Sequence, residues 1–234
     1  MNRISLLIAL LSCSIIVSAQ QDVKLKKKDY KRDVELVTTA GNITIRLSDS
    51  TPLHRDNFLK LVKSKFYDSV LFHRVIKNFM IQSGDPDSKR AEAGKPLGNG
   101  SPGYTIPAEF RPGLFHKKGV IAAARTSDNV NPEKRSSGSQ FYIVQGKTFT
   151  DTGLDSVERD RLKRKLPEAH REVYKTLGGT PHLDQNYTVF GEVVKGLEVV
   201  DIIATVTTSR TPPDRPVEDV RILKAHLVKR KKRL

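Results

Sequence analysis

Tryptophan is absent from the sequence, and cysteine occurs once among the 234 residues, as Cys13. Because a lone thiol cannot form an intramolecular disulfide, the chain has to fold without one, and redox chemistry is excluded. Aromatic residues make up 6% of the chain and hydrophobic residues 37%, so a core is possible but the surface is heavily charged. The length suits one large domain or two small ones.

Recognisable metal and cofactor motifs are also missing. The histidines lack the close spacing of metal ligands and have no cysteine partner in the predicted mature chain. There is no nucleophile elbow and no phosphate-binding loop. We therefore expect neither a metal nor a cofactor. The six histidines are His54, His73, His116, His170, His182 and His226.

One long apolar run, Ile4–Val17, follows Arg3 and leads to the small residue Ala19. This pattern is typical of a signal peptide, and the run is too short for a comfortable membrane span. We therefore predict that residues 1–19 are removed between Ala19 and Gln20, which leaves a soluble, exported, periplasmic chain.

A lipoprotein is the alternative to soluble export. Leu10-Leu11-Ser12-Cys13 resembles a bacterial lipoprotein box, which would leave a lipidated Cys13 as the new N-terminus. The apolar residues Ile15–Val17 would then follow the anchor, where a polar tether is more usual. We therefore favour the soluble form.

Positive charge is in excess, with a formal net charge of +15 and an isoelectric point near 9.9. It is concentrated in a basic linker, residues 20–32, and in a basic tail, residues 229–234. Such clusters bind nucleic acid or anionic membranes by releasing counterions. No aromatic residues are interleaved with the tail and no nucleic-acid module is present. We expect a monomer without a specific nucleic-acid partner, and at most weak contact with an anionic membrane surface.

Strand and helix patterns follow one another through residues 33–228. Alternating hydrophobicity marks the strands, and apolar residues at helical spacing mark the helices. The predicted elements include strands at 33–39 and 42–47, a helix from Pro52 to about Lys65, a surface loop at 86–107, a helix at 196–205 and a closing strand at 217–228.

A strand pair with unexpected polar residues lies at Val70–Pro86. Apolar runs on both sides of residues 77–78 favour a β-hairpin. It contains His73, Arg74 and Gln82, which a simple core hairpin does not need, and an unpartnered buried polar group costs roughly 1–3 kcal/mol. Alternation across a two-residue turn would place Arg74 and Gln82 on opposite faces, so a site that uses both requires a bulge or a longer loop.

Three ordered segments carry a family resemblance. Residues 72–85 (FHRVIKNFMIQSGD) and 138–143 (GSQFYI) resemble the two signatures of the cyclophilins, the barrel-type peptidyl-prolyl isomerases. Residues 182–194 (HLDQNYTVFGEVV) resemble the strand region that completes their proline pocket. The resemblance covers about residues 33–228 and implies a mostly β protein, with a closed eight-stranded antiparallel barrel capped by two α-helices.

The chain departs from the compact family pattern at residues 147–179. We predict a helical insertion here, with Asp155 or Ser156 capping one helix and Pro167 starting another. Its apolar side is predicted to contain Leu162, Leu166, Val173 and Leu177. The insertion either touches substrates or is inert, and the residues leave both interpretations open.

The resemblance implies a chemistry without a nucleophile. Exchange of an X–Pro bond must cross a barrier of about 18–20 kcal/mol, and a catalyst has to bind the twisted amide better than either planar form. Arg74 would donate to the proline nitrogen, because guanidinium stays charged and presents several donors. Gln82 would bind substrate and orient Arg74.

The remaining site residues also follow from the resemblance. Ala124 and Arg125 match an Ala-Asn pair that holds the residue before proline, and Gln140 matches a position that lines the groove. His182 stands where cyclosporin-sensitive members carry Trp, so strong cyclosporin binding is not expected. Tyr187 stands where many members have His. The pocket-lining positions are Phe79, Met80, Tyr142, Leu183 and Tyr187.

These observations predict an isomerase that accelerates X–Pro exchange in exported, unfolded or partly folded proteins and so assists their folding. Two alternatives remain open. The pocket could bind proline segments without turnover, or the basic linker and tail could dominate, with the β domain as a scaffold.

Overall fold

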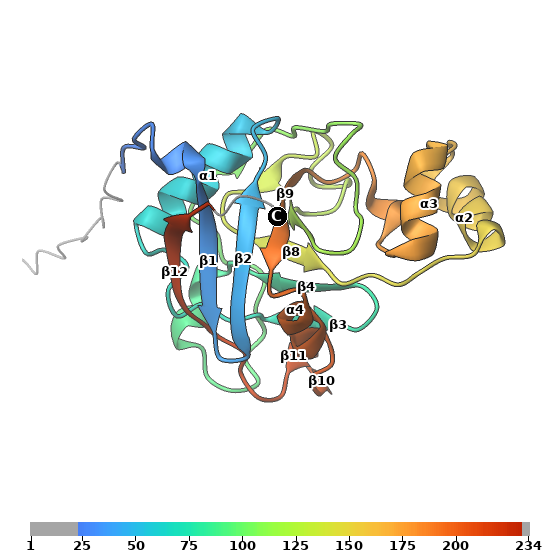
Figure 1. Cartoon of the computed structure of the whole chain (residues 1–234). Helices are drawn as coiled ribbons and strands as arrows, with labels where there is room; N and C mark the ends of the chain where they lie inside the picture. The colour runs from blue at the N-terminus through green and yellow to red at the C-terminus, as the bar shows by residue number, and fades with distance from the viewer. Residues whose placement is uncertain (1–22, 231–234) are drawn as a thin grey trace, which may run out of the picture.

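A curled antiparallel sheet forms the centre of the molecule (Figure 1). The computed structural model describes residues 23–230; the predicted signal peptide, its cleavage site, Cys13 and the last four residues of the basic tail lie outside the described residues. In spatial order the strands are β12 (Ile222–Lys229), β1 (Arg32–Thr38), β2 (Gly41–Leu47), β9 (Val189–Lys195), β6 (Val120–Ala123), β8 (Phe141–Val144), β4 (Met80–Ser83) and β3 (Arg74–Ile76).

Shorter elements surround this sheet. Two small ladders pair β10 (Thr208–Arg210) with β11 (Pro213–Pro216), and β5 (Thr105–Ile106) with β7 (Ser136–Ser137). Three short 3-10 turns are η1 (Asp29–Lys31), η2 (Pro86–Arg90) and η4 (Pro181–Leu183). No helix within residues 23–230 is both long and apolar enough to cross a membrane.

The sheet is a curled half-barrel, and the closed barrel that the resemblance implies is not confirmed. Its two edge strands, β12 and β3, are not paired with each other. The chain just before them makes an isolated bridge between Leu71 and Arg221, beside a hydrogen bond from the Phe72 N–H to the Val220 carbonyl (2.8 Å). β3 is three residues long and turns at once into β4, so it has little chain with which to continue a ladder along β12.

Each face of the sheet carries its own apolar core, because strand side chains alternate between faces. On β4, Ile81 belongs to the main core while Met80 belongs to a second core on the opposite face. Helices α1 (Pro52–Lys63) and α4 (Leu197–Ala204) lie close to their predicted positions, and both bury apolar side chains in the main core. Each fully buried Val, Leu, Ile or Phe side chain contributes about 1.5–3 kcal/mol to the stability of the fold.

The closing strand was predicted to begin too early. β12 starts at Ile222, and Val217 is 60% exposed. Antiparallel pairing with β1 explains the actual extent, since Arg32 pairs with Lys229 and Thr38 with Ile222. The residues before Ile222 therefore lie outside the ladder between β12 and β1.

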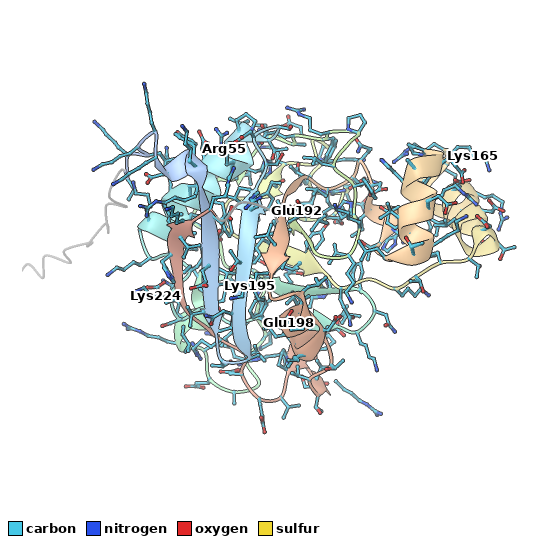
Figure 2. The ribbon with its side chains drawn as sticks, in the orientation of Figure 1. Arg55, Lys165, Glu192, Lys195, Glu198 and Lys224 are labelled. Carbon is cyan, nitrogen blue, oxygen red and sulfur yellow. The ribbon has the colours of Figure 1, made fainter. Side chains whose placement is uncertain are left out.

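The segment predicted as an insertion forms a small helical unit at one side of the sheet (Figure 1). It consists of α2 (Asp151–Val157), the π-helical turn η3 (Glu158–Leu162) and α3 (Glu168–Thr176). Its core contains Leu154, Leu166 and Tyr174, all nearly inaccessible to solvent. Figure 2 shows Lys165 on the far side of this unit from the sheet.

Two details of the predicted insertion are wrong. The α2 cap is Thr150, whose Oγ1 accepts from the Gly153 N–H (3.1 Å), so Asp155 and Ser156 lie inside the helix. Leu177 is 44% exposed, because α3 ends at Thr176 and its buried side is built around Tyr174 instead.

Candidate active site

The second core, on the outer face of the sheet, forms the wall of a small pocket of about 110 Å³. Alternation and register bring its residues together, because Tyr142 of β8 pairs with Gln82 of β4 on one side and with Ala122 of β6 on the other. Nine of the predicted site residues line it: Arg74, Phe79, Met80, Gln82, Ala124, Arg125, Tyr142, Leu183 and Tyr187.

Arg74 and Gln82 form a direct cross-strand pair. Residues 77–79 make a three-residue loop in which Asn78 takes a left-handed conformation (φ 63°), and this loop puts both side chains on the same face. The Arg74 Nη1 donates to Gln82 Oε1 at 3.4 Å. The requirement for more than a two-residue turn is therefore confirmed.

Gln140 holds Gln82 from the other side. The Gln82 Nε2 donates to Gln140 Oε1 (3.1 Å), and the Gln140 Nε2 donates to the carbonyls of Gly98 and Gly100 (2.9 and 2.8 Å). The amide orientation of Gln82 is thereby set, since its oxygen has to face Arg74. Gln140 lies in a second hollow of about 220 Å³ next to the first, where it lines the wall with Gln82 and Arg125.

The Arg125 side chain is packed into the structure, with 4% of it exposed. Its guanidinium lies 4.5 Å from the centre of the Tyr187 ring, and its Nε donates to the Asn186 carbonyl at 2.9 Å. Its Nη1 also lies 2.6 Å from Asp128. Most of its donors are thus used within the protein, and its main effect is to fix the Tyr187 ring at the pocket rim.

His182 contributes by supporting Phe79 from η4. The two rings stack with their centres 5.6 Å apart and their planes at 28°. Burial, with the nearby charge of Arg161, lowers the pKa of His182 to about 4, so the ring is neutral at pH 7 and presents an aromatic face. It is not among the residues that line the pocket itself.

Three residues near the site were missed from the sequence. Asp214 of β11 lies 3.4 Å from the Arg74 Nε, and His116 lies 2.9 Å from the Tyr142 hydroxyl. Asp184 in turn lies 3.0 Å from the other nitrogen of His116. Asp184 is adjacent to Leu183 in the third motif, which was a usable signal, whereas Asp214 comes from a distant turn that carries none.

Metal ligands do not gather in this region. Across residues 23–230, no group of three or more His, Cys, Asp or Glu side chains is placed to hold an ion. What the pocket does present is an apolar wall with the Arg74 guanidinium at its edge. That arrangement can bind a ring and donate a hydrogen bond to an amide beside it.

Known proteins are similar to this chain in sequence and in fold. The family model "Cyclophilin type peptidyl-prolyl cis-trans isomerase/CLD" matches residues 33–227. A putative peptidyl-prolyl cis-trans isomerase of Staphylococcus haemolyticus is 34% identical over 194 residues, 82% of this chain and 89% of that protein. A putative bifunctional phosphatase/peptidyl-prolyl cis-trans isomerase of Streptococcus pyogenes is 36% identical over 191 residues, but the chain spans only 37% of its length.

The fold likeness extends to solved structures. The crystal structure of a cyclophilin type isomerase of Cryptosporidium parvum covers 86% of this chain and 99% of its own, with a TM-score of 0.60 and 20% identity. The half-barrel with a pocket on its outer face thus defines a cyclophilin-like class. With the sequence matches, the chain belongs to the cyclophilin-type peptidyl-prolyl cis-trans isomerase family.

Proposed function

We propose that this pocket catalyses X–Pro isomerisation in unfolded or partly folded polypeptides, and that Arg74 supplies the catalytic hydrogen bond. The direct Arg74–Gln82 pair at the edge of an apolar pocket carries the proposal. A proline ring would enter between Met80 and Tyr142, which places its amide nitrogen towards Arg74. Twisting the amide localises the nitrogen lone pair, and a preorganised charged donor typically lowers such a barrier by about 2.7–4 kcal/mol.

The other site residues have supporting roles in this proposal. Gln82, held by Gln140, orients the guanidinium and offers a hydrogen bond to the substrate. Phe79 and Leu183 close the apolar wall. The backbone at Ala124 lies where the residue before proline would pass, along the second hollow.

The test is the cis-to-trans rate of a short X–Pro peptide with wild type and Arg74→Ala. We expect wild type to accelerate the exchange and the variant to lose roughly 100-fold in kcat/KM. Arg159→Ala is the matched control, because the Arg159 side chain lies in the insertion, is 68% exposed and pairs with Asp160. If kcat/KM of a folded Arg74→Ala protein falls by less than about tenfold, Arg74 is not the catalytic donor.

A binding module is the competing function. The same pocket could hold proline peptides without turnover, and then peptides would bind while their exchange rate stayed at the uncatalysed value. The Arg74–Gln82 pair favours the enzyme, because a simple proline receptor needs the apolar wall but not a guanidinium beside the ring nitrogen.

We further propose that the protein acts on exported proteins outside the cytoplasm. The support is the apolar run Ile4–Val17 with its small-residue ending. Mass spectrometry of the mature N-terminus tests this: a chain beginning at Gln20 indicates soluble export, whereas a lipidated Cys13 indicates an anchored form. An intact Met1 would contradict both.

Weak contact with an anionic membrane surface is proposed for the basic segments. Pairing of β1 with β12 brings the linker and the start of the tail together, since Arg32 pairs with Lys229. The buried carboxylate of Asp33 pairs with Arg46 and with Arg230 of the tail. Asp29 is also buried and pairs with Lys63, so these two carboxylates offset only part of the basic charge. Salt-sensitive sedimentation with anionic vesicles supports this contact. Binding to DNA but not to vesicles, or loss of function on deleting both basic segments with an intact pocket, would favour the scaffold alternative.

A further inference from the structure

Four buried side chains connect the helical insertion to the wall of the pocket. Tyr174 of α3 donates its hydroxyl hydrogen to Asp184 Oδ2 (2.8 Å), and Asp184 Oδ1 lies 3.0 Å from His116 Nδ1. His116 Nε2 lies 2.9 Å from the Tyr142 hydroxyl, and Tyr142 lines the pocket. The relative exposure of all four residues is 4% or less.

From this continuous chain we propose that the insertion positions the proline pocket, with Tyr174, Asp184 and His116 acting as positioning residues for Tyr142. The inference rests on the proposed function, because it concerns how that pocket is held. It assigns to the insertion a role that the residues alone left undecided.

The direction of the hydrogen bonds follows from the carboxylate. Asp184 can only accept, so the His116 Nδ1 carries a hydrogen and, in the neutral ring, Nε2 is free to accept from Tyr142. Burial raises the pKa of Tyr142, so that hydroxyl keeps its hydrogen at neutral pH. Asp184 Oδ1 also accepts from the His116 backbone N–H (2.8 Å), which ties the ring and its own backbone to one oxygen.

Tyr174 is the member that belongs to the insertion. Burial, with the charge of Asp184, raises the pKa of its hydroxyl, which therefore stays a donor. Without this donor, Asp184 Oδ2 would be a buried carboxylate oxygen lacking its side-chain partner. Buried hydrogen-bonded networks in a low dielectric are sensitive to one missing partner. Removing the Tyr174 hydroxyl is therefore expected to change the position of Tyr142 at the other end of the network.

Backbone contacts fix the same junction. The N–H of Thr180 donates to the His116 carbonyl, and the N–H of Lys118 donates to the Gly178 carbonyl (2.8 and 2.9 Å). Phe115, next to His116 in the chain, stacks on His170 of α3 with ring centres 3.8 Å apart. The segment that leads into β6 is therefore held by α3 and by the residues that follow α3.

Tyr174→Phe is the primary test, because it removes one hydroxyl and keeps the ring. We expect kcat/KM for a proline peptide to fall roughly fivefold, mainly through a higher KM, since Arg74 is untouched. Tyr142→Phe cuts the chain at its other end and should give a similar change. The double variant should then fall no further than the larger single effect, because both replacements break one network.

Glu158→Gln is the matched control. Glu158 is a buried carboxylate of the same insertion, bonded to Arg171, and it makes no bond to the four-residue chain. We expect this variant to lower stability while leaving KM within a factor of about two, provided that it is measured where the protein is folded. A role of the insertion in stability alone predicts the same KM change for Glu158→Gln as for Tyr174→Phe.

A second readout separates this inference from the isomerase proposal. Amide NMR shifts of residues 181–187 report the position of the pocket wall without any turnover, and should move in Tyr174→Phe but not in Glu158→Gln. The inference is overturned if those shifts and KM are unchanged in folded Tyr174→Phe, or if the two tyrosine variants are additive. Wild type without activity, but with the expected shifts, overturns the isomerase proposal alone.

Discussion

Asp214 Oδ2 lies 3.4 Å from the Nε of Arg74, while the Nη1 of the same guanidinium donates to Gln82. Asp214 reaches this position from β11, which packs beside β3, in a left-handed backbone conformation (φ 62°). Both side chains are about two-fifths exposed, so the ion pair itself contributes little to stability. Its consequence is geometric, because it limits the rotation of the proposed catalytic donor.

Asp214→Asn should therefore affect catalysis more than folding. We expect kcat to fall by about two- to fivefold with a small change in KM, because the guanidinium acts in the twisted state more than in substrate binding. The free energy of unfolding should change by less than about 0.5 kcal/mol. Peptide isomerisation kinetics and urea titrations check the two effects.

Asp219→Asn is the appropriate control, since Asp219 pairs with Arg215 and Arg221 rather than with Arg74. It should leave kcat unchanged. A rise of kcat in Asp214→Asn would show that the carboxylate restrains Arg74 from the substrate instead of orienting it.

Gln82→Glu tests the amide between Arg74 and Gln140. The new carboxylate would pair with Arg74 but could no longer donate to Gln140 Oε1, which would then face a negative oxygen. We expect kcat/KM to fall roughly tenfold or more, because the charge of Arg74 is partly neutralised and its position shifts. Gln82→Leu, which removes both bonds without adding charge, should lose less; equal losses would rule out the charge effect.

The pocket could largely be predicted from the sequence because its residues lie inside three short segments. Arg74, Phe79, Met80 and Gln82 come from one hairpin, and their order alone locates them. A loop longer than two residues then accounts for the pairing of Arg74 with Gln82. Nine of the eleven predicted positions line one pocket, whereas Gln140 bonds to Gln82 from the neighbouring hollow and His182 stacks on Phe79.

Other features depend on contacts between distant segments, which a single sequence does not display. Asp214 reaches Arg74, and Tyr174 reaches Asp184, only through the packing of β11 on β3 and of α3 on the chain at His116. Leu177 was assigned to a core that is built around Tyr174 instead. The closed barrel depended on pairing between β3 and β12, and β3 is too short to provide it.

The buried side chain of His73 is expected to make the protein less stable in mild acid. Its ring is buried, with 4% exposed, and its two nitrogens have no hydrogen-bond partner within the described chain. Burial lowers its pKa to about 4, partly offset by the charge of Asp85. Between pH 6.5 and 4 the unfolded state binds a proton that the folded state does not. The free energy of unfolding therefore decreases as the pH is lowered, by up to about 3 kcal/mol.

His73→Phe removes this titration and keeps an aromatic ring. The free energy of unfolding from urea titrations should depend less on pH between 6.5 and 4 in the variant than in wild type. A slope that remains in the variant is expected from His182, whose pKa is also lowered to about 4. Identical slopes in the two proteins would show that His73 takes up its proton without cost.

Glu158 holds the insertion together through charge. Its side chain is 3% exposed and accepts from the Leu166 N–H and from Arg171 Nη1, both at 2.9 Å, while Lys165 lies 2.8 Å away. Burial opposes ionisation, but these donors prevail and lower the pKa of Glu158 to about 2. The folded-state pKa lies below the ordinary value of 4.5, so the stabilisation is present above pH 4.5 and is lost as the pH falls towards 2.

Glu158→Gln should destabilise the helical unit locally by about 3 kcal/mol, because it leaves Arg171 with an incomplete set of partners. The α3 amides should exchange hydrogen faster at pH 7, while amides of β1 and β2 keep their protection, since their ladder does not involve this unit. Wild type should lose α3 protection between pH 4.5 and 2, and the variant should change less over that range. Uniform loss of protection across sheet and insertion would mean instead that the unit unfolds only with the whole domain.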